Sequence, residues 1–200
     1  MTDRYLPPEE TLKRYIGREL SPRRCQHSLG VADLAGQMAG KMGLDPAPAR
    51  VAGLLHDHMR ETEPAELLRI ARSLGFALHM MEIRYPVLLH SPIGAALLPE
   101  KFGIRDPEIL EAVRYHTTGA GRMGLLARIV FTADLLEPSR NYPGVEELRQ
   151  VAERDPEAGF EVCVQHHLVH LIDRKRQLHP DTVDCWNHCV NKEDGFGRIG

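Results

Sequence analysis

AGLLHDHMRE, from Ala52 to Glu61, places a histidine and a carboxylate side by side at the end of an apolar run. Neighbouring residues on an α-helix project about 100° apart, so His56 and Asp57 can face one ion only at an inward-facing or fraying helix end. Gly53 leaves room for another element to approach that end closely. A His-Asp dipeptide alone is more often a core histidine beside a carboxylate, so its role depends on the rest of the chain.

Composition limits the possible classes of function. The chain has 200 residues, 42% hydrophobic and 26% charged, which are ordinary values for one soluble globular domain. Its formal net charge of −3 argues against non-specific nucleic-acid binding, which needs a basic face. No apolar run is long enough for a membrane span, and the N-terminus lacks the apolar core of a signal peptide. The four cysteines form no paired framework, so we expect a cytoplasmic protein. We expect no nucleic-acid or membrane partner, and the sequence leaves the oligomeric state open, with a homodimer as one possibility.

Apolar spacing predicts an all-α fold, a single helical bundle, because the alternation typical of strands is not convincing anywhere. Residues 1–20 are expected to form an N-terminal helix of the same domain, residues 21–189 the main domain, and residues 190–200 a tail that frays. The helix boundaries follow from three signals: capping residues that precede prolines, glycines that end a helix, and the extent of each apolar stripe. The expected helices are 9–19, 22–42, 46–56, 64–75, one beginning near 90, 107–116, 125–137, and two more between 144 and 189.

Polar residues occupy core positions on two of these helices. His27 shares an apolar stripe with Val31 and Leu34, and Asp134 continues the line of Leu126 and Val130. Burying a carboxylate without a partner costs several kcal/mol. A buried arginine would provide a partner, but a metal ion would account for His27, the His-Asp pair and Asp134 together. His90 and His116 lie at element ends, each beside a loop that can admit a ligand.

The order H…HD…H…H…D resembles the HD-domain metal-dependent phosphohydrolases. Six blocks in the right order, covering roughly residues 21 to 187, are similar to one branch, the YqeK family of symmetrical bis(5′-nucleosyl)-tetraphosphatases. The resemblance implies an all-helical HD domain that binds an iron-type metal and splits diadenosine tetraphosphate into two ADP molecules. The blocks are HSLGVADLA, AGLLHDHMRE, LLHSPIGAALL, AVRYHTTG, ARIVFTADLLEPSR and LHPDTVDCWN.

The resemblance also implies roles for individual residues. Its metal-ligand positions are matched here by His27, His56, Asp57 and Asp134. Its phosphate-contacting positions are matched by His90, His116 and Arg140. Two residues depart from the family pattern: Arg60 stands where lysine is usual, and His58 is unexpected.

The chemistry of these residue types agrees with the resemblance. Two imidazoles and two carboxylates suit iron, with manganese or cobalt as alternatives, and leave coordination positions open for water and phosphate. Arg24 and Arg60 join Arg140 as phosphate-binding candidates because guanidinium matches phosphate bidentately, and Thr117 extends this set. The predicted catalytic residues are Asp57, His90 and His116, with either histidine able to protonate the leaving phosphate.

Two alternative functions remain open at this point. One is an HD-domain phosphatase acting on nucleoside mono- or triphosphates, and the other is a non-catalytic nucleotide-sensing module. The histidines at 166, 167 and 170 are interpreted as a solvated helix face. Adenosine is expected to be held near Leu178 to Trp186.

Overall fold

Many helices begin at a proline that directly follows a capping residue, as the sequence predicts. The computed structural model describes residues 5–191, and within that range the regular structure is helical throughout, without a strand. The α-helices are α1 (Glu9–Glu19), α2 (Pro22–Lys41), α3 (Pro46–Leu55), α4 (Pro64–Ser73), α5 (Met80–Arg84), α6 (His90–Phe102), α7 (Pro107–Tyr115), α8 (Leu125–Leu136), α9 (Val145–Arg154), α10 (Pro156–Asp173) and α11 (Pro180–Val190), and one 3-10 helix, Pro86–Leu89, precedes α6.

The last third of the chain holds one helix more than expected. The prediction of two helices there is wrong, because Asp155 and Pro156 interrupt what reads as one polar stretch and separate α9 from α10. The Asp155 side chain accepts hydrogen bonds from the backbone N–H groups of Glu157 and Ala158 and so caps α10. Proline at the first helical position reinforces that start.

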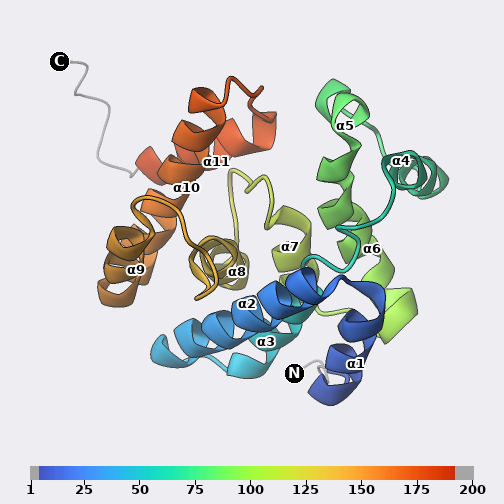
Figure 1. Ribbon diagram of the computed structural model, residues 1–200, viewed down its shortest axis with the longest axis horizontal. Coiled ribbons are helices and arrows are strands. Elements are labelled where there is room, and N and C mark those ends of the chain that lie inside the picture. Colours follow the sequence, from blue (N-terminus) through green and yellow to red (C-terminus); the bar gives the residue numbers. More distant parts are fainter. Residues whose placement is uncertain (1–4, 192–200) are drawn as a thin grey trace.

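The centre of the bundle consists of α2, α3, α7 and α8, which pack against one another. Figure 1 shows α4, α5 and α6 on one side of this centre and α9, α10 and α11 on the other. The all-α bundle is therefore confirmed. No helix in the described range is long and apolar enough to cross a membrane. The tail expected to fray lies, from residue 192 on, outside the described residues.

The closest approach in the centre is between α2 and α3. A Cβ added at Gly53 would lie 2.7 Å from the Cα of Ala32 and 2.8 Å from its nitrogen, so only glycine fits there. Helix α3 ends at Leu55, and His56 and Asp57 follow in a turn. Both features agree with the prediction from AGLLHDHMRE, and they direct His56 towards the helix that carries His27.

Candidate metal centre

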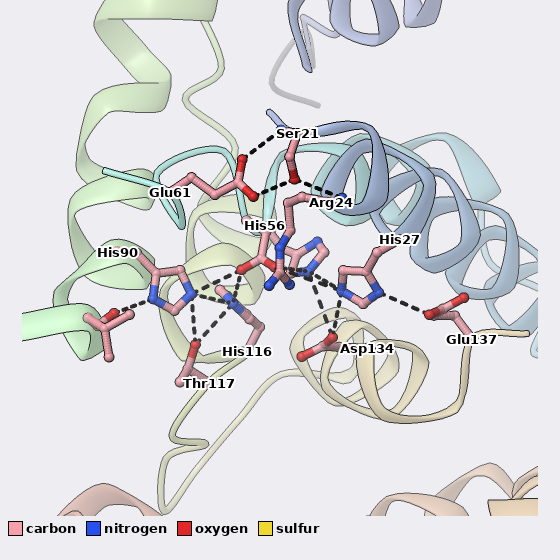
Figure 2. Close-up of polar contacts among 12 residues, drawn as sticks. Ser21, Arg24, His27, His56, Glu61, His90, His116, Thr117, Asp134 and Glu137 are labelled. Carbon is pink, nitrogen blue, oxygen red and sulfur yellow. Dashed lines mark hydrogen bonds and ion pairs between the residues drawn. The ribbon is translucent and has the colours of Figure 1, made fainter. Parts of the chain in front are cut away.

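Six side chains predicted as metal ligands or phosphate contacts converge in the centre of the bundle (Figure 2). Five helices or their ends supply them, and all except Asp134, which is partly exposed, are buried. They are His27 from α2, His56 and Asp57 from the turn after α3, His90 from the start of α6, His116 from the end of α7, and Asp134 from α8.

The four predicted metal ligands form one group. The Nε2 atom of His27 lies 3.2 Å from Nε2 of His56 and 3.0 Å from Oδ1 of Asp134. Nε2 of His56 lies 3.4 Å from Oδ2 of Asp57 and 3.8 Å from Oδ1 of Asp134. An ion about 2.1 Å from each ligand would separate adjacent ligand atoms in an octahedron by about 3 Å. These atoms are therefore spaced as ligands of a single ion.

The second oxygen of Asp57 faces the other two histidines. Oδ1 of Asp57 lies 3.1 Å from Nε2 of His90 and 3.4 Å from Nε2 of His116, and the two Nε2 atoms are 3.0 Å apart. The hydroxyl of Thr117 lies 3.2 Å and 3.0 Å from the same two nitrogens. Asp57 thus joins two groups of ligand atoms, one on each carboxylate oxygen.

The four histidines of the two ligand groups are each held in orientation by a hydrogen bond of the Nδ1 atom. Nδ1 of His56, His90 and His116 faces a backbone carbonyl at 2.7, 2.5 and 2.8 Å, and Nδ1 of His27 faces Oε1 of Glu137 at 3.0 Å. Each Nδ1 therefore donates a proton, and in a neutral imidazole each Nε2 then carries a lone pair. Lone pairs 3.0–3.2 Å apart repel one another unless positive charge lies among them. The donor set fits a metal ion, since this is the orientation that metal-binding histidines require.

Both carboxylates are held in their ionised form. Burial raises the pKa of the Asp57 carboxyl, but the adjoining imidazoles of His56, His116 and His90 outweigh burial and bring that pKa well below its usual range. Burial likewise acts against ionisation of Asp134, and His27, His56 and Arg140 together lower its pKa. Ionised carboxylates are the form that binds metal.

Arginines border the ligand group, as predicted. Arg24 donates to Oδ2 of Asp57 at 2.6 Å, and Arg140 donates to Oδ1 of Asp134 at 2.5 Å. Arg60 lines the same cavity, of about 210 Å³, as Asp57 and Thr117. The arrangement combines a site for a cation with guanidinium groups for an anion beside it.

Comparison with known proteins places this arrangement in a family. The model of the HD domain matches residues 24–139, which include all six converging side chains. The symmetrical bis(5′-nucleosyl)-tetraphosphatase of Bacillus subtilis is 32% identical over 176 residues, covering 88% of this chain and 94% of that protein. The chain belongs to the HD-domain symmetrical bis(5′-nucleosyl)-tetraphosphatase family. The protein of the same description from Halalkalibacterium halodurans is 34% identical, covering 86% of this chain and 91% of its own.

A solved structure supports the HD-domain fold directly. The crystal structure of a protein from Clostridium acetobutylicum, described as a predicted HD superfamily hydrolase involved in NAD metabolism, has a TM-score of 0.88 and 33% identity. The similarity covers 93% of this chain and 98% of that one. The family resemblance in the sequence is thereby confirmed.

Two residues of this HD-domain site escape prediction from sequence. Glu137 is buried, faces Nδ1 of His27 and accepts hydrogen bonds from the backbone and hydroxyl of Ser139 at 2.8 and 2.5 Å. His167 lines the cavity that also holds His90, and its ring packs edge-on against Phe131. The interpretation of residues 166–170 as a solvated face is therefore wrong for His167, whose pKa burial lowers to about 4. The predicted face is correct for His170, which is exposed.

The two departures from the family pattern have different surroundings. Arg60 lines the cavity, where its guanidinium can serve the role expected of a lysine. His58 instead is buried, hydrogen-bonded through Nε2 to the carbonyl of Gly94 at 3.1 Å, and packed beside Tyr15 and Phe102. Burial lowers its pKa to about 4, so it is a neutral core residue.

Proposed function

We propose that the chain hydrolyses diadenosine tetraphosphate symmetrically to two ADP molecules in a metal-dependent reaction. The observation that carries this proposal is the pair of ligand groups joined by Asp57, with arginines beside both carboxylates. Membership of a family whose relatives are described as symmetrical bis(5′-nucleosyl)-tetraphosphatases supports the choice of substrate. The free state of all four cysteines is compatible with the cytoplasmic location we propose.

The metal in this proposal is iron, with manganese or cobalt as alternatives. The residues that would hold it are His27, His56, Asp57 and Asp134, whose nitrogen and oxygen donors suit these borderline ions. When bound, such an ion polarises a phosphoryl group and lowers the pKa of bound water to about 7. The absence of a cysteine from this ligand set argues against a closed structural zinc site.

The chain's own residues bind and orient the phosphates. Arg24, Arg60 and Arg140 offer planar donors that match phosphate oxygens bidentately and neutralise part of their charge. His90 and His116 lie on the far oxygen of Asp57, where each ring, in its protonated form, could donate its Nε2 proton to the phosphate that leaves and return to the neutral imidazole. The Thr117 hydroxyl, in contact with both rings, can hold a phosphate oxygen in the same place.

The position of the cut provides the test. Metal-reloaded protein is mixed with diadenosine tetraphosphate, and the nucleotides at an early time point are separated by chromatography. We expect ADP as the sole first product. Equal amounts of AMP and ATP would contradict the symmetrical cut but leave the metal centre intact.

Two further measurements separate the alternative functions. Release of inorganic phosphate from nucleoside mono- or triphosphates, at a higher rate than ADP formation, would favour a general HD-domain phosphatase. Tight binding without turnover in the presence of iron, manganese or cobalt would favour a sensing module.

Alanine at His90 or His116 is expected to reduce turnover by about 10²- to 10⁴-fold, the range for a lost acid-base group.

A further inference from the structure

The carbonyl groups at the end of α8 are bonded by arginines from outside the helix. The last four carbonyls of an α-helix have no partner within that helix. In α8, the carbonyl of Asp134 accepts a hydrogen bond from Nε of Arg140 at 2.7 Å. The carbonyl of Leu136, the last residue, accepts one from Nε of Arg149 of α9 at 2.8 Å. Two positive side chains therefore fix the end of the helix that carries Asp134, where they also complement the helix dipole.

Arg149 also bonds the loop between α8 and α9. Its Nη2 atom donates to the carbonyls of Glu137 and Arg140, at 2.8 and 2.9 Å. Together with Leu136, three backbone carbonyls therefore share one guanidinium. The remaining nitrogen, Nη1, pairs with Glu146, an exposed carboxylate in the first turn of α9. Because a guanidinium is planar and rigid, these bonds fix the three carbonyls relative to one another as well as to α9.

The two loop residues that Arg149 holds by their backbone both direct their side chains to the metal centre. Figure 2 shows Glu137 beside His27, and the Glu137 carboxylate lies 3.0 Å from Nδ1 of that histidine. Arg140 donates to Oδ1 of Asp134 at 2.5 Å and lines the cavity of about 210 Å³ where the phosphates are expected. Arg149 itself does not line that cavity. It can therefore affect the centre through the residues it holds, without contact to a bound ion or phosphate.

Substitution of Arg149 would leave backbone carbonyls without their donor. Leu136 is buried, so its carbonyl could regain a partner only if the end of the helix moved towards water. The carbonyl of Glu137 would keep the backbone N–H of Arg140 at 2.9 Å, but that bond lies within the loop and does not tie the loop to α9. A displacement of about 1 Å is enough to disturb a site that depends on the orientation of its groups.

We propose that Arg149 is a positioning residue of the metal centre. By bridging the carbonyls of Leu136, Glu137 and Arg140, it holds the Glu137 carboxylate against His27 and the Arg140 guanidinium at the phosphate site. This inference rests on the proposed function for the identity of the metal and the phosphates. Its consequence is that one side chain outside the site supports both the ion and the anion.

The first measurement is metal affinity, determined for the full-length protein by competition between manganese binding and a chelator of known affinity. Arg149→Ala should weaken manganese binding by about 10-fold, the lower end of what a group that holds a metal-binding histidine contributes. In a Glu137→Ala background, the same substitution should cause a much smaller loss, because the carboxylate through which Arg149 acts is already gone. An equal loss in both backgrounds would overturn the inference.

The second measurement is the binding of inorganic pyrophosphate at saturating manganese, by titration calorimetry. Arg149→Ala should weaken pyrophosphate binding by about 10-fold, the lower end for a lost charge-assisted hydrogen bond. In an Arg140→Ala background this effect should largely disappear, because the guanidinium that Arg149 positions is absent. A general loss of stability would instead weaken binding equally in both backgrounds, and that result would overturn the inference.

Two variants separate the bridge between carbonyls from charge alone. Glu146→Gln removes the charge of the exposed partner of Nη1 but leaves the three carbonyl bonds, so both affinities should stay unchanged. Arg149→Lys keeps the positive charge but has one nitrogen in place of three, so it should resemble Arg149→Ala. If Arg149→Ala does not fold, Arg149→Lys carries both measurements and both double substitutions.

The inference is overturned if Arg149→Lys, or a folded Arg149→Ala, binds manganese and pyrophosphate as tightly as the unmodified protein. It is also overturned if Glu146→Gln loses as much affinity as Arg149→Lys, since the ion pair on α9 would then be the important contact. Failure of the proposed function gives a different result: both affinities would respond to the Arg149 substitutions as expected, but diadenosine tetraphosphate would yield no ADP.

Discussion

Asp57 is the residue on which both ligand groups depend. Its Oδ2 atom faces His56 and its Oδ1 atom faces His90 and His116, and the whole side chain is buried. Asp134, in contrast, belongs to the first group alone. The two carboxylates therefore have different consequences for metal binding, although both are ligand candidates.

Substitution of these two carboxylates should separate one bound ion from two. Asp134→Ala should lower metal content only at the His27–His56 group, and Asp57→Ala should lower it at every ion present, because a carboxylate that contacts both groups is lost. Metal content per chain, measured by elemental analysis after purification without chelators or affinity-tag metal, checks this. A full complement of metal in Asp134→Ala would show that the proposed ligand set is wrong.

Glu137 orients His27 and is expected to influence metal affinity without binding the ion. Residues that hold the far nitrogen of a metal-binding histidine typically contribute about 10- to 100-fold to affinity. Glu137→Ala should lose that factor, and Glu137→Gln, which keeps an acceptor for the His27 Nδ1 proton, should lose less. Competition with a chelator of known affinity gives the measurement, and equal affinities in all three proteins would contradict the role.

Sequence alone predicts the side chains that converge in the bundle but not the residues that hold them in place. Asp134 is noticeable because a carboxylate on an apolar stripe requires a partner. Glu137 carries no such signal, because an acidic residue at a helix end beside proline is ordinary. No sequence pattern indicates that His167 faces the cavity. The histidines at 166 and 170 suggest an exposed face, and only the packing of α10 on α8 turns the residue between them inward.

At the scale of elements, the contact of α2 with α3 sets the distance between His27 and His56. The two backbones meet at Gly53 and Ala32. Any side chain at residue 53 would have to push α3 away from α2. That movement would separate the two imidazoles as well as open the core.

Two glycine substitutions test this contact. Gly53→Ala should destabilise the fold by about 1–3 kcal/mol, the usual cost of overpacking, and lower metal affinity. Gly17→Ala, in helix α1 with no atom within 4 Å of the added methyl group, should stabilise the fold by about 0.5–1 kcal/mol. Urea unfolding of both variants measures the difference, and similar free energies of unfolding would contradict the close packing.

The ion pair between α1 and α3 gives the fold a dependence on pH. Arg50 donates to both carboxylate oxygens of Glu9, at 2.8 and 2.7 Å, and these hydrogen bonds lower the pKa of Glu9 to about 2. Because this folded pKa is below the unfolded value of 4.5, the stabilisation is complete above pH 4.5 and is lost as the pH falls towards 2.

Glu9→Gln should remove this contribution. Partial exposure screens the pair, so we expect about 1 kcal/mol at pH 7 and a shrinking difference from the unmodified protein below pH 4.5. Unfolding in urea at pH 7, 4 and 3 provides the comparison. Glu153→Gln, which removes the exposed pair with Lys41, is the control and should change stability little at any of these pH values. A difference for Glu9→Gln that grows on acidification would contradict the assignment.

Elements marked by proline caps are the ones that sequence predicts well. Pro22, Pro46, Pro64 and Pro107 begin helices where expected. The boundary at Pro156 carries the same signal, but the polar composition of the last third hides the apolar stripes that would show two separate helices around it. The helix–helix distances on which the site depends follow from packing, and no local pattern encodes them.

For the molecule as a whole, a bound ion would connect helices that are far apart in the chain. The four proposed ligands come from α2, the end of α3 and α8, so unfolding any of these would release the metal. Free metal at about 100 times its dissociation constant should therefore stabilise the fold by about 2.7 kcal/mol.

Thermal unfolding of chelator-treated and metal-reloaded protein measures this stabilisation. We expect a higher midpoint after reloading and a much smaller shift in Asp134→Ala. Equal midpoints with and without metal in the unmodified protein would mean that the ion does not bind within the folded bundle.

The spread of ligands along the chain also bears on how the protein is made. His27 leaves the ribosome well before its partner Asp134, because Asp134 lies in α8, more than 100 residues further along the chain (134 − 27 = 107). A nascent chain shorter than that carries His27, His56 and Asp57 without the second carboxylate. The complete ligand set therefore exists only after α8 has been made, and an ion bound by this set would be acquired by a chain whose central helices have already been translated.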